Sequence, residues 1–104
     1  MNRWNIPVWL EKEVVERDRQ CVYCRNPFGS RSGKRSLSSW EHIINDAEIV
    51  TRENIVLCCR SCNSSKGAKL LAKWLESAYC KRREINSDTV ADIVKRALKL
   101  VQNS

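Results

Sequence analysis

Two Cys-x-x-Cys pairs constrain this chain more than any other feature of its sequence. The first pair is Cys21 and Cys24, and the second is Cys59 and Cys62. Such a turn lets two sulfurs face one ion, and two turns complete the four-sulfur tetrahedron that zinc prefers. A chain of 104 residues buries proportionally little apolar surface, so a structural metal would help it to fold. The sequence therefore predicts one structural Zn²⁺ bound by these four thiolates.

Two further cysteines, Cys58 and Cys80, stand outside these pairs. Cys58 adjoins Cys59 and competes with it for the metal. Only Cys59 has Cys-x-x-Cys spacing to Cys62, and successive residues of a strand point to opposite faces. We therefore expect Cys58 and Cys80 to be small buried hydrophobic residues. Disulfides are the other use of six cysteines, but the sequence opens without a signal peptide, which favours metal binding in a cytoplasmic protein.

The composition is that of a soluble globular domain with a polyanionic partner. Hydrophobic residues make up 42% of the chain and charged residues 30%, which is too apolar for disorder. The formal net charge is +7, and the basic residues are concentrated in segments 24–40 and 60–83. Acidic residues lie mostly in 11–18 and 41–53. This segregation favours nucleic acid as the partner over a charge that only confers solubility. No run approaches a membrane span.

Hydrophobic periodicity predicts a small α+β domain. Apolar residues at helical spacing predict a helix over 6–19, in which Pro7 suits the first turn and Asn5 is a candidate cap. Runs rich in β-branched and aromatic residues predict short strands over 38–44 and 55–58.

The C-terminal region of about 68–104 is predicted to be helical. One helix is expected to start within 60–63, with Gly67 as an interruption. An amphipathic pattern then predicts a helix over 70–83 that ends in three cations. The last helix is expected to begin with Ser87 as its N-cap and to present one apolar stripe to the core.

His42 is the single histidine of the chain, and its neighbours suggest a catalytic role. Glu41 precedes it, Asn54 lies just ahead of the second predicted strand, and Asn63 directly follows the last cysteine of the second pair. These residues, in the sequences CVYC, WEHII and ENIVLCCRSCNSSKG, resemble the HNH endonuclease family in its ββα-metal form with a four-cysteine zinc. The resemblance covers about residues 14–67.

The resemblance implies a ββα-metal core with a four-cysteine zinc site, flanked by an N-terminal helix and C-terminal helices in a single domain over 1–104. It implies that His42 is the general base and that Asn54 orients it by steadying the loop. Glu41 and Asn63 would bind a catalytic Mg²⁺ or Mn²⁺, hard cations that prefer oxygen ligands. Neutral imidazole, with a reference pKa of roughly 6.5, suits the deprotonation of water near neutral pH.

The implied function is a metal-dependent DNA endonuclease that nicks DNA or cuts both strands. Arg60, Lys66 and Lys69 lie in or beside the predicted helix and are expected to contact phosphates. Small members of the family often belong to phages and mobile elements, so the resemblance implies a bacterial or phage-infected cell. Two residues depart from the common pattern: Glu41 stands where aspartate is usual, and Asn63 replaces the final histidine.

Two other functions are compatible with parts of the sequence. A non-catalytic zinc-stabilised DNA-binding module would need the thiolates and the basic residues but would have no use for Glu41, His42 and Asn63 together. A redox protein is the weaker alternative, because two matched cysteine pairs imply a shared ion. The sequence leaves open the cleavage preference, the catalytic metal, and whether the protein is a monomer or a dimer.

Overall fold

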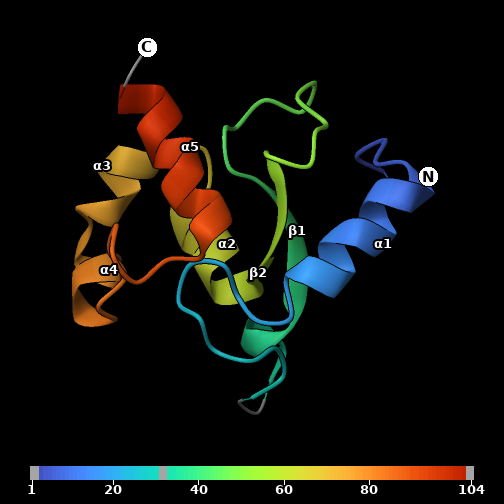
Figure 1. The fold of residues 1–104 in the computed structure, drawn as a ribbon. Helices are drawn as coiled ribbons and strands as arrows, with labels where there is room; N and C mark the ends of the chain where they lie inside the picture. Colours follow the sequence, from blue (N-terminus) through green and yellow to red (C-terminus); the bar gives the residue numbers. More distant parts are fainter. Residues whose placement is uncertain (1–2, 31–32, 103–104) are drawn as a thin grey trace.

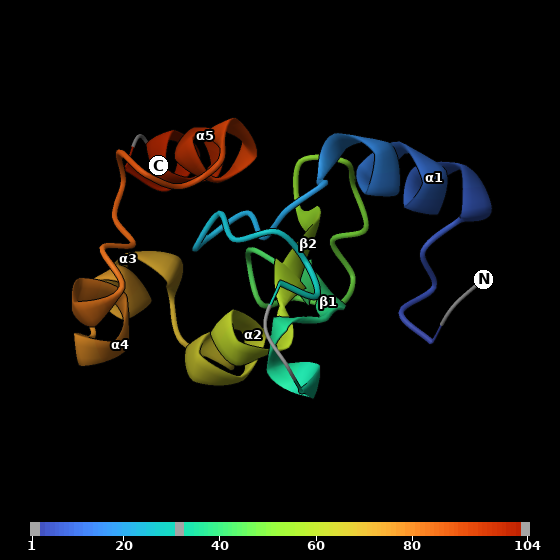
Figure 2. The same cartoon turned by 90° about the horizontal axis from the view of Figure 1, so that it is seen from below.

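The structure is a computed structural model that describes residues 3–30 and 33–102. Its elements in chain order are α1 (Val8–Arg17), η1 (Lys34–Ser36), β1 (Ser38–His42), β2 (Ile55–Cys59), α2 (Arg60–Lys66), α3 (Leu71–Leu75), α4 (Ala78–Arg82) and α5 (Asp92–Gln102). The antiparallel strands β1 and β2 lie at the centre, between α1 and the group of C-terminal helices (Figure 1). Figure 2 shows α2 directly after the hairpin. The predicted α+β class with consecutive β, β and α elements is confirmed.

The β1–β2 hairpin separates two parts of the core. All five residues of β2 are buried. Ile55 and Leu57 pack against α1, whereas Val56 and Cys58 pack against the first cysteine pair and the C-terminal helices. This alternation follows from the pleat of the strand. Because His42 pairs with Ile55, its side chain shares the face that α1 covers.

The first helix is shorter than predicted. α1 begins at Val8, and Pro7 occupies the N-cap position without a side-chain cap hydrogen bond. The prediction that Asn5 caps this helix is wrong, because Asn5 lies outside the cap with a φ of 60°. The predicted apolar face is present, since Leu10 and Val14 are fully buried against β2.

The segment after α2 is more broken than predicted. Gly67 ends α2 with a φ of 50°, a conformation that favours glycine. The single helix predicted over 70–83 is wrong: α3 and α4 are separate helices of five residues each. Ser77 separates them, because its Oγ accepts a hydrogen bond from the backbone N–H of Cys80 at 3.3 Å and starts a new helix.

The last helix begins later than predicted, at Asp92 instead of near Ser87. The Oδ1 atom of Asn86 accepts hydrogen bonds from the backbone N–H groups of Asp88, at 2.8 Å, and Thr89, at 3.2 Å. These bonds hold the backbone in a turn that competes with the first helical turn. The predicted apolar stripe of α5 does pack on the core.

Cys58 and Cys80 are fully buried among apolar side chains, as predicted. The largest fully buried side chain is Trp74 of α3, which packs edge-on against Tyr23 with ring centroids 4.9 Å apart. The C-terminal helices therefore close the core over the first cysteine pair. Within the described ranges, no helix combines the length and the apolar character that crossing a membrane requires.

Candidate metal centre and catalytic site

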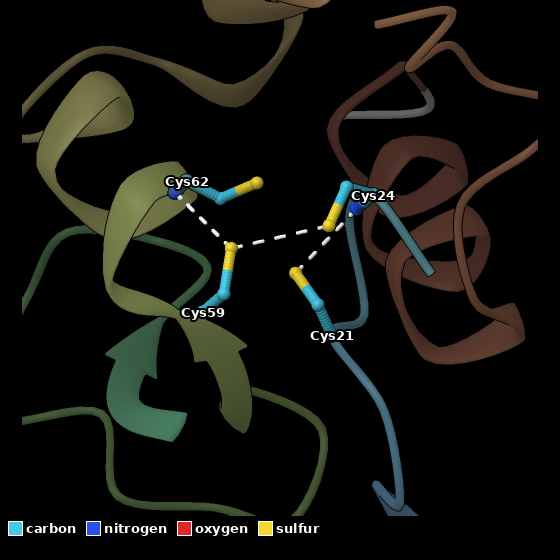
Figure 3. A group of neighbouring side chains, drawn as sticks. All are labelled: Cys21, Cys24, Cys59 and Cys62. Atoms are coloured by element: carbon cyan, nitrogen blue, oxygen red, sulfur yellow. Dashed lines mark hydrogen bonds between the residues drawn. The ribbon is translucent and has the colours of Figure 1, made fainter. Parts of the chain in front are cut away.

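The two cysteine pairs meet at one point. Cys21 and Cys24 come from the loop after α1, Cys59 ends β2, and Cys62 lies in the first turn of α2. Their Sγ atoms lie within 4.8 Å of one another, and the four side chains point to a common centre (Figure 3). The sulfurs of Cys24 and Cys59 are 3.9 Å apart. Four sulfurs at ~2.3 Å from zinc in a tetrahedron are ~3.8 Å apart, so the cluster fits this ion.

Hydrogen bonds within the cluster shift the pKa values of the four thiols in opposite directions. The N–H of Cys24 donates to Sγ of Cys21, and that of Cys62 donates to Sγ of Cys59, each at 3.4 Å. The Cys21 thiol lowers the pKa of Cys24 to about 7 and holds the pKa of Cys59 far below its usual range. The pKa of Cys21 is raised, mainly by its hydrogen bond with Cys24. The pKa of Cys62 is also raised, mainly by its hydrogen bond with Cys21. Sulfurs this close ionise together only beside a cation, which a divalent metal supplies.

Glu41 lies on the face of β1 opposite to that of His42, and its side chain is buried. Its Oε2 atom accepts a hydrogen bond from the hydroxyl of Tyr23 at 2.8 Å and lies 3.0 Å from Nζ of Lys66. Nζ of Lys66 also donates to the carbonyl oxygen of Ile43 at 3.0 Å. Burial, together with the charge of Glu41, raises the pKa of Tyr23 well above its usual value. The predicted metal ligand thus belongs to a buried polar cluster.

Lys66 is fully buried, and this corrects one of the predicted phosphate contacts. An ammonium group that is bound to Glu41 inside the protein cannot reach a DNA backbone. The prediction that Lys66 contacts DNA is therefore wrong. The side chains of Arg60 and Lys69 are exposed, and Nζ of Lys69 donates to the carbonyl oxygen of Ser65 at 3.0 Å. These two residues stay predicted contacts.

Asn63 also packs against β1. Its Nδ2 atom donates to Oγ of Ser39 at 3.0 Å and to the carbonyl oxygen of Trp40 at 3.1 Å, so Oδ1 is the atom through which the predicted metal contact would form. Asn63 and Lys66 share one face of α2, since residues at i and i+3 are neighbours on a helix. Ser39 and Glu41, at i and i+2, share one face of β1. Facing elements therefore carry an amide and a carboxylate oxygen, donors that suit Mg²⁺ or Mn²⁺.

His42 is the last residue of β1 and is buried. Its Nε2 atom has no hydrogen-bond partner among the residues that the structure describes. Every other buried side-chain nitrogen or oxygen atom of the described residues has one. The indole ring of Trp4 covers the imidazole edge-on, with ring centroids 5.4 Å apart. Burial lowers the pKa of His42, and the negative charges of Glu41 and Asp46 oppose this shift. An imidazole with a lowered pKa and a free nitrogen is equipped to accept a proton.

Asn54 holds the loop that follows His42. Its Oδ1 atom accepts a hydrogen bond from the N–H of Ile44 at 2.7 Å. Its Nδ2 atom donates to the carbonyl oxygens of Ile44, at 3.2 Å, and Ile49, at 3.1 Å. The backbone carbonyl of Asn54 also accepts from the N–H of Ile43 at 3.0 Å. These contacts connect the start of β2 to the residues just beyond His42.

Three residues around this site were not predicted from the sequence. Tyr23 lies between the first two cysteines, Ser39 lies in β1, and Trp4 precedes α1. Each contacts a predicted site residue through tertiary packing: Tyr23 contacts Glu41, Ser39 contacts Asn63, and Trp4 contacts His42. None carries a motif or a spacing that would have indicated its role.

A two-stranded hairpin followed by a helix, with four cysteines around one point, defines a small ββα-metal protein. The family model of HNH endonuclease matches residues 21–69, and this part of the chain is an HNH endonuclease domain. The chain is 33% identical over 92 residues to a CRISPR-associated endonuclease Cas9 from Corynebacterium diphtheriae. This match covers 86% of the chain but only 8% of that relative's length. No solved structure matches the chain.

Proposed function

We propose that this protein is a metal-dependent DNA endonuclease that hydrolyses phosphodiester bonds, nicking or cutting duplex DNA. One observation carries the proposal most directly: Nε2 of His42 is buried, and among the described residues it has no hydrogen-bond partner. Leaving such an atom unpaired costs stability, so its persistence suggests that it serves a reacting water. The HNH endonuclease domain and the name of the similar endonuclease support the same function.

In this proposal His42 takes a proton from the water that attacks the scissile phosphate. Asn54 acts through position, because its hydrogen bonds hold the loop that follows the imidazole. Glu41 and Asn63 would hold Mg²⁺ or Mn²⁺ through Oε1 and Oδ1, since Oε2 of Glu41 and Nδ2 of Asn63 already have partners. When bound, this cation would supply positive charge that stabilises the phosphate and the leaving oxygen.

The four cysteines have a separate role in the proposal. They would bind a structural Zn²⁺ that joins the loop after α1 to the end of the hairpin and to α2. This position would let the ion hold the catalytic hairpin in place without taking part in the chemical step. The exposed side chains of Arg60 and Lys69 would contact phosphates of the DNA.

Cleavage of supercoiled plasmid tests the proposal. Wild-type protein and His42→Ala are purified in parallel and incubated with plasmid, with and without added Mg²⁺ or Mn²⁺. We expect wild-type cleavage only with the added cation, and a rate about 10²–10⁴ lower for His42→Ala. Zinc content and DNA affinity should be nearly unchanged in the variant, because a general base acts only in the chemical step.

Two results would contradict the proposal. Equal cleavage by wild type and His42→Ala would remove His42 from the chemistry. Tight DNA binding without cleavage in the presence of either cation would identify the protein as a non-catalytic zinc-stabilised module instead.

A further inference from the structure

A hollow of about 460 Å³ lies beside the cysteine cluster and is lined by Cys24 and Cys59. Residues from four segments line it: the loop that carries Cys24, η1, the junction of β2 with α2, and α4 with the residue that follows it. Three of the lining residues are arginines, Arg35, Arg82 and Arg83, and among the described residues that line the hollow there is no aspartate or glutamate. The volume is that of a small-ligand site, but the charge selects for anions.

The three guanidinium groups are free to bind an external anion. All three residues are exposed, and within residues 3–30 and 33–102 none of them forms an ion pair with a carboxylate. Elsewhere on the surface, Arg52 does form an ion pair with a carboxylate: its Nε atom lies 2.7 Å from Oε2 of Glu13. No carboxylate of the described residues therefore neutralises the arginines of the hollow.

One of these arginines is held in position through the cysteine cluster. The Cζ atom of Arg83 lies 3.7 Å from the centroid of the Tyr79 ring, and Nη1 donates to the carbonyl oxygen of Tyr79 at 3.4 Å. The Tyr79 hydroxyl in turn is 2.8 Å from Oγ of Ser61 and donates to Sγ of Cys62 at 3.4 Å. A guanidinium that is stacked in this way loses less freedom when it binds a phosphate.

A competing explanation is that the arginines only offset the negative charge of a zinc bound to four thiolates. The contacts do not favour this explanation. In the described part of the chain the hydroxyl of Tyr79 reaches Cys62, and no guanidinium donates to a cysteine sulfur. The three arginines line the hollow, and the contacts of Arg83 are with Tyr79 instead of the cysteines.

We infer that this hollow binds the phosphodiester backbone of DNA at a point away from the scissile phosphate. The inference rests on the proposed function and adds a second contact surface to it. Cys59 lines the hollow and lies at one end of the hairpin, where it pairs with Ser38, whereas His42 lies at the other end, opposite Ile55. Four residue steps along a β-strand span ~13 Å, which corresponds to the axial rise of about four phosphates of one DNA strand.

Fluorescence anisotropy with a labelled 20-base-pair duplex tests the inference, at several salt concentrations and without added divalent cation. The test variant is Arg82→Gln with Arg83→Gln. The matched control is Arg96→Gln with Lys99→Gln, which removes the same charge from exposed positions of α5 that do not line the hollow. We expect the test variant to bind at least tenfold more weakly. The slope of log K against log salt should fall by about 1.8, since each lost phosphate contact removes about 0.9. The control should keep the wild-type slope.

The single variant Arg83→Lys separates planar recognition from charge, because it keeps the charge and loses the stacked guanidinium. We expect its affinity to lie between those of wild type and the double variant. Zinc content, measured on every sample, should be equal. Equal affinities for the test and control variants, or loss of zinc in the test variant alone, would overturn the inference.

These outcomes are distinct from a failure of the proposed nuclease function. A protein that cleaves plasmid but binds equally well without Arg82 and Arg83 loses only the second contact surface. A protein that binds through the hollow but never cleaves keeps that surface and loses the catalytic assignment.

Discussion

The Nζ atom of Lys66 lies 3.0 Å from Oε2 of Glu41, and the two side chains are 0% and 7% exposed. A pair buried this deeply is stable only when its remaining hydrogen-bonding groups are satisfied. Here Tyr23 donates to the carboxylate, and the ammonium donates to the carbonyl oxygen of Ile43. The pair joins α2 to β1 beside Asn63. Lys66 was expected to contact DNA, but it instead positions Glu41, the proposed metal ligand.

Replacing Lys66 by Met should destabilise the protein strongly. Glu41 would remain buried without its partner charge, which typically costs about 3–5 kcal/mol. Urea unfolding of Lys66→Met, with Lys69→Met as the matched control, measures this difference. Lys69 is exposed, so its variant should unfold within about 0.5 kcal/mol of wild type. Equal stability of the two variants would show that the buried pair contributes nothing.

The cysteine cluster predicts one zinc per chain. Cys24→Ser should lose the metal and unfold or aggregate, because four ligands are needed and the core is small. Cys80→Ser serves as the control: Cys80 is buried outside the cluster, so this variant should keep its zinc despite a modest loss of stability. Elemental analysis of both proteins checks the outcome. A folded wild-type protein without zinc would contradict the assignment.

The pKa of His42 predicts a specific pH dependence. Burial holds this pKa below 6.5 in the folded protein, whereas the unfolded chain has the ordinary value. As the pH falls, His42 therefore binds a proton in the unfolded chain before it does so in the folded protein. This difference lowers the free energy of unfolding as the pH falls from about 6.5 through the folded pKa. Cleavage should decline over the same lower range, since imidazolium cannot accept a proton. Because the chain has one histidine, its NMR titration gives the pKa without ambiguity.

Trp4 should contribute to this shift. Its ring covers the imidazole of His42 with centroids 5.4 Å apart, and removing it admits water. In Trp4→Ala we expect the pKa of His42 to rise toward 6.5, because desolvation is the largest cause of the shift. Trp9→Ala is the matched control, since Trp9 is exposed on α1. A pKa that stays the same in Trp4→Ala would assign the desolvation to other side chains.

Asn54→Ala should weaken both the fold and catalysis. It removes three side-chain hydrogen bonds and leaves the N–H of Ile44 without its acceptor, at a cost of about 1–3 kcal/mol. The cleavage rate should fall further than stability alone explains, because the loop beyond His42 loses its anchor. Asn45→Ala, an exposed substitution in the same loop, is the control. The comparison is made by plasmid cleavage at a temperature where both variants are folded.

The features that were predicted correctly depend on short-range patterns. Ligand spacing identifies the two cysteine pairs, runs rich in β-branched and aromatic residues identify the two strands, and helical periodicity identifies α1. The predicted helix boundaries were wrong where a side chain accepts a hydrogen bond from a nearby backbone N–H group. Ser77 divides the helix predicted over 70–83, and Asn86 delays the start of α5. Such bonds depend on geometry that periodicity does not contain.

The sequence by itself determined the two cysteine pairs, the resemblance to the HNH family and the order of the ββα elements, because the spacing within each pair and the pattern within each element involve residues close together in the chain. Only the tertiary structure decided that Lys66 faces Glu41 inside the protein and that Trp4 covers His42. It also decided that arginines from η1 and α4 line one hollow. These contacts join segments far apart in sequence, and their partners follow from how the helices pack around the hairpin. No local pattern records that packing.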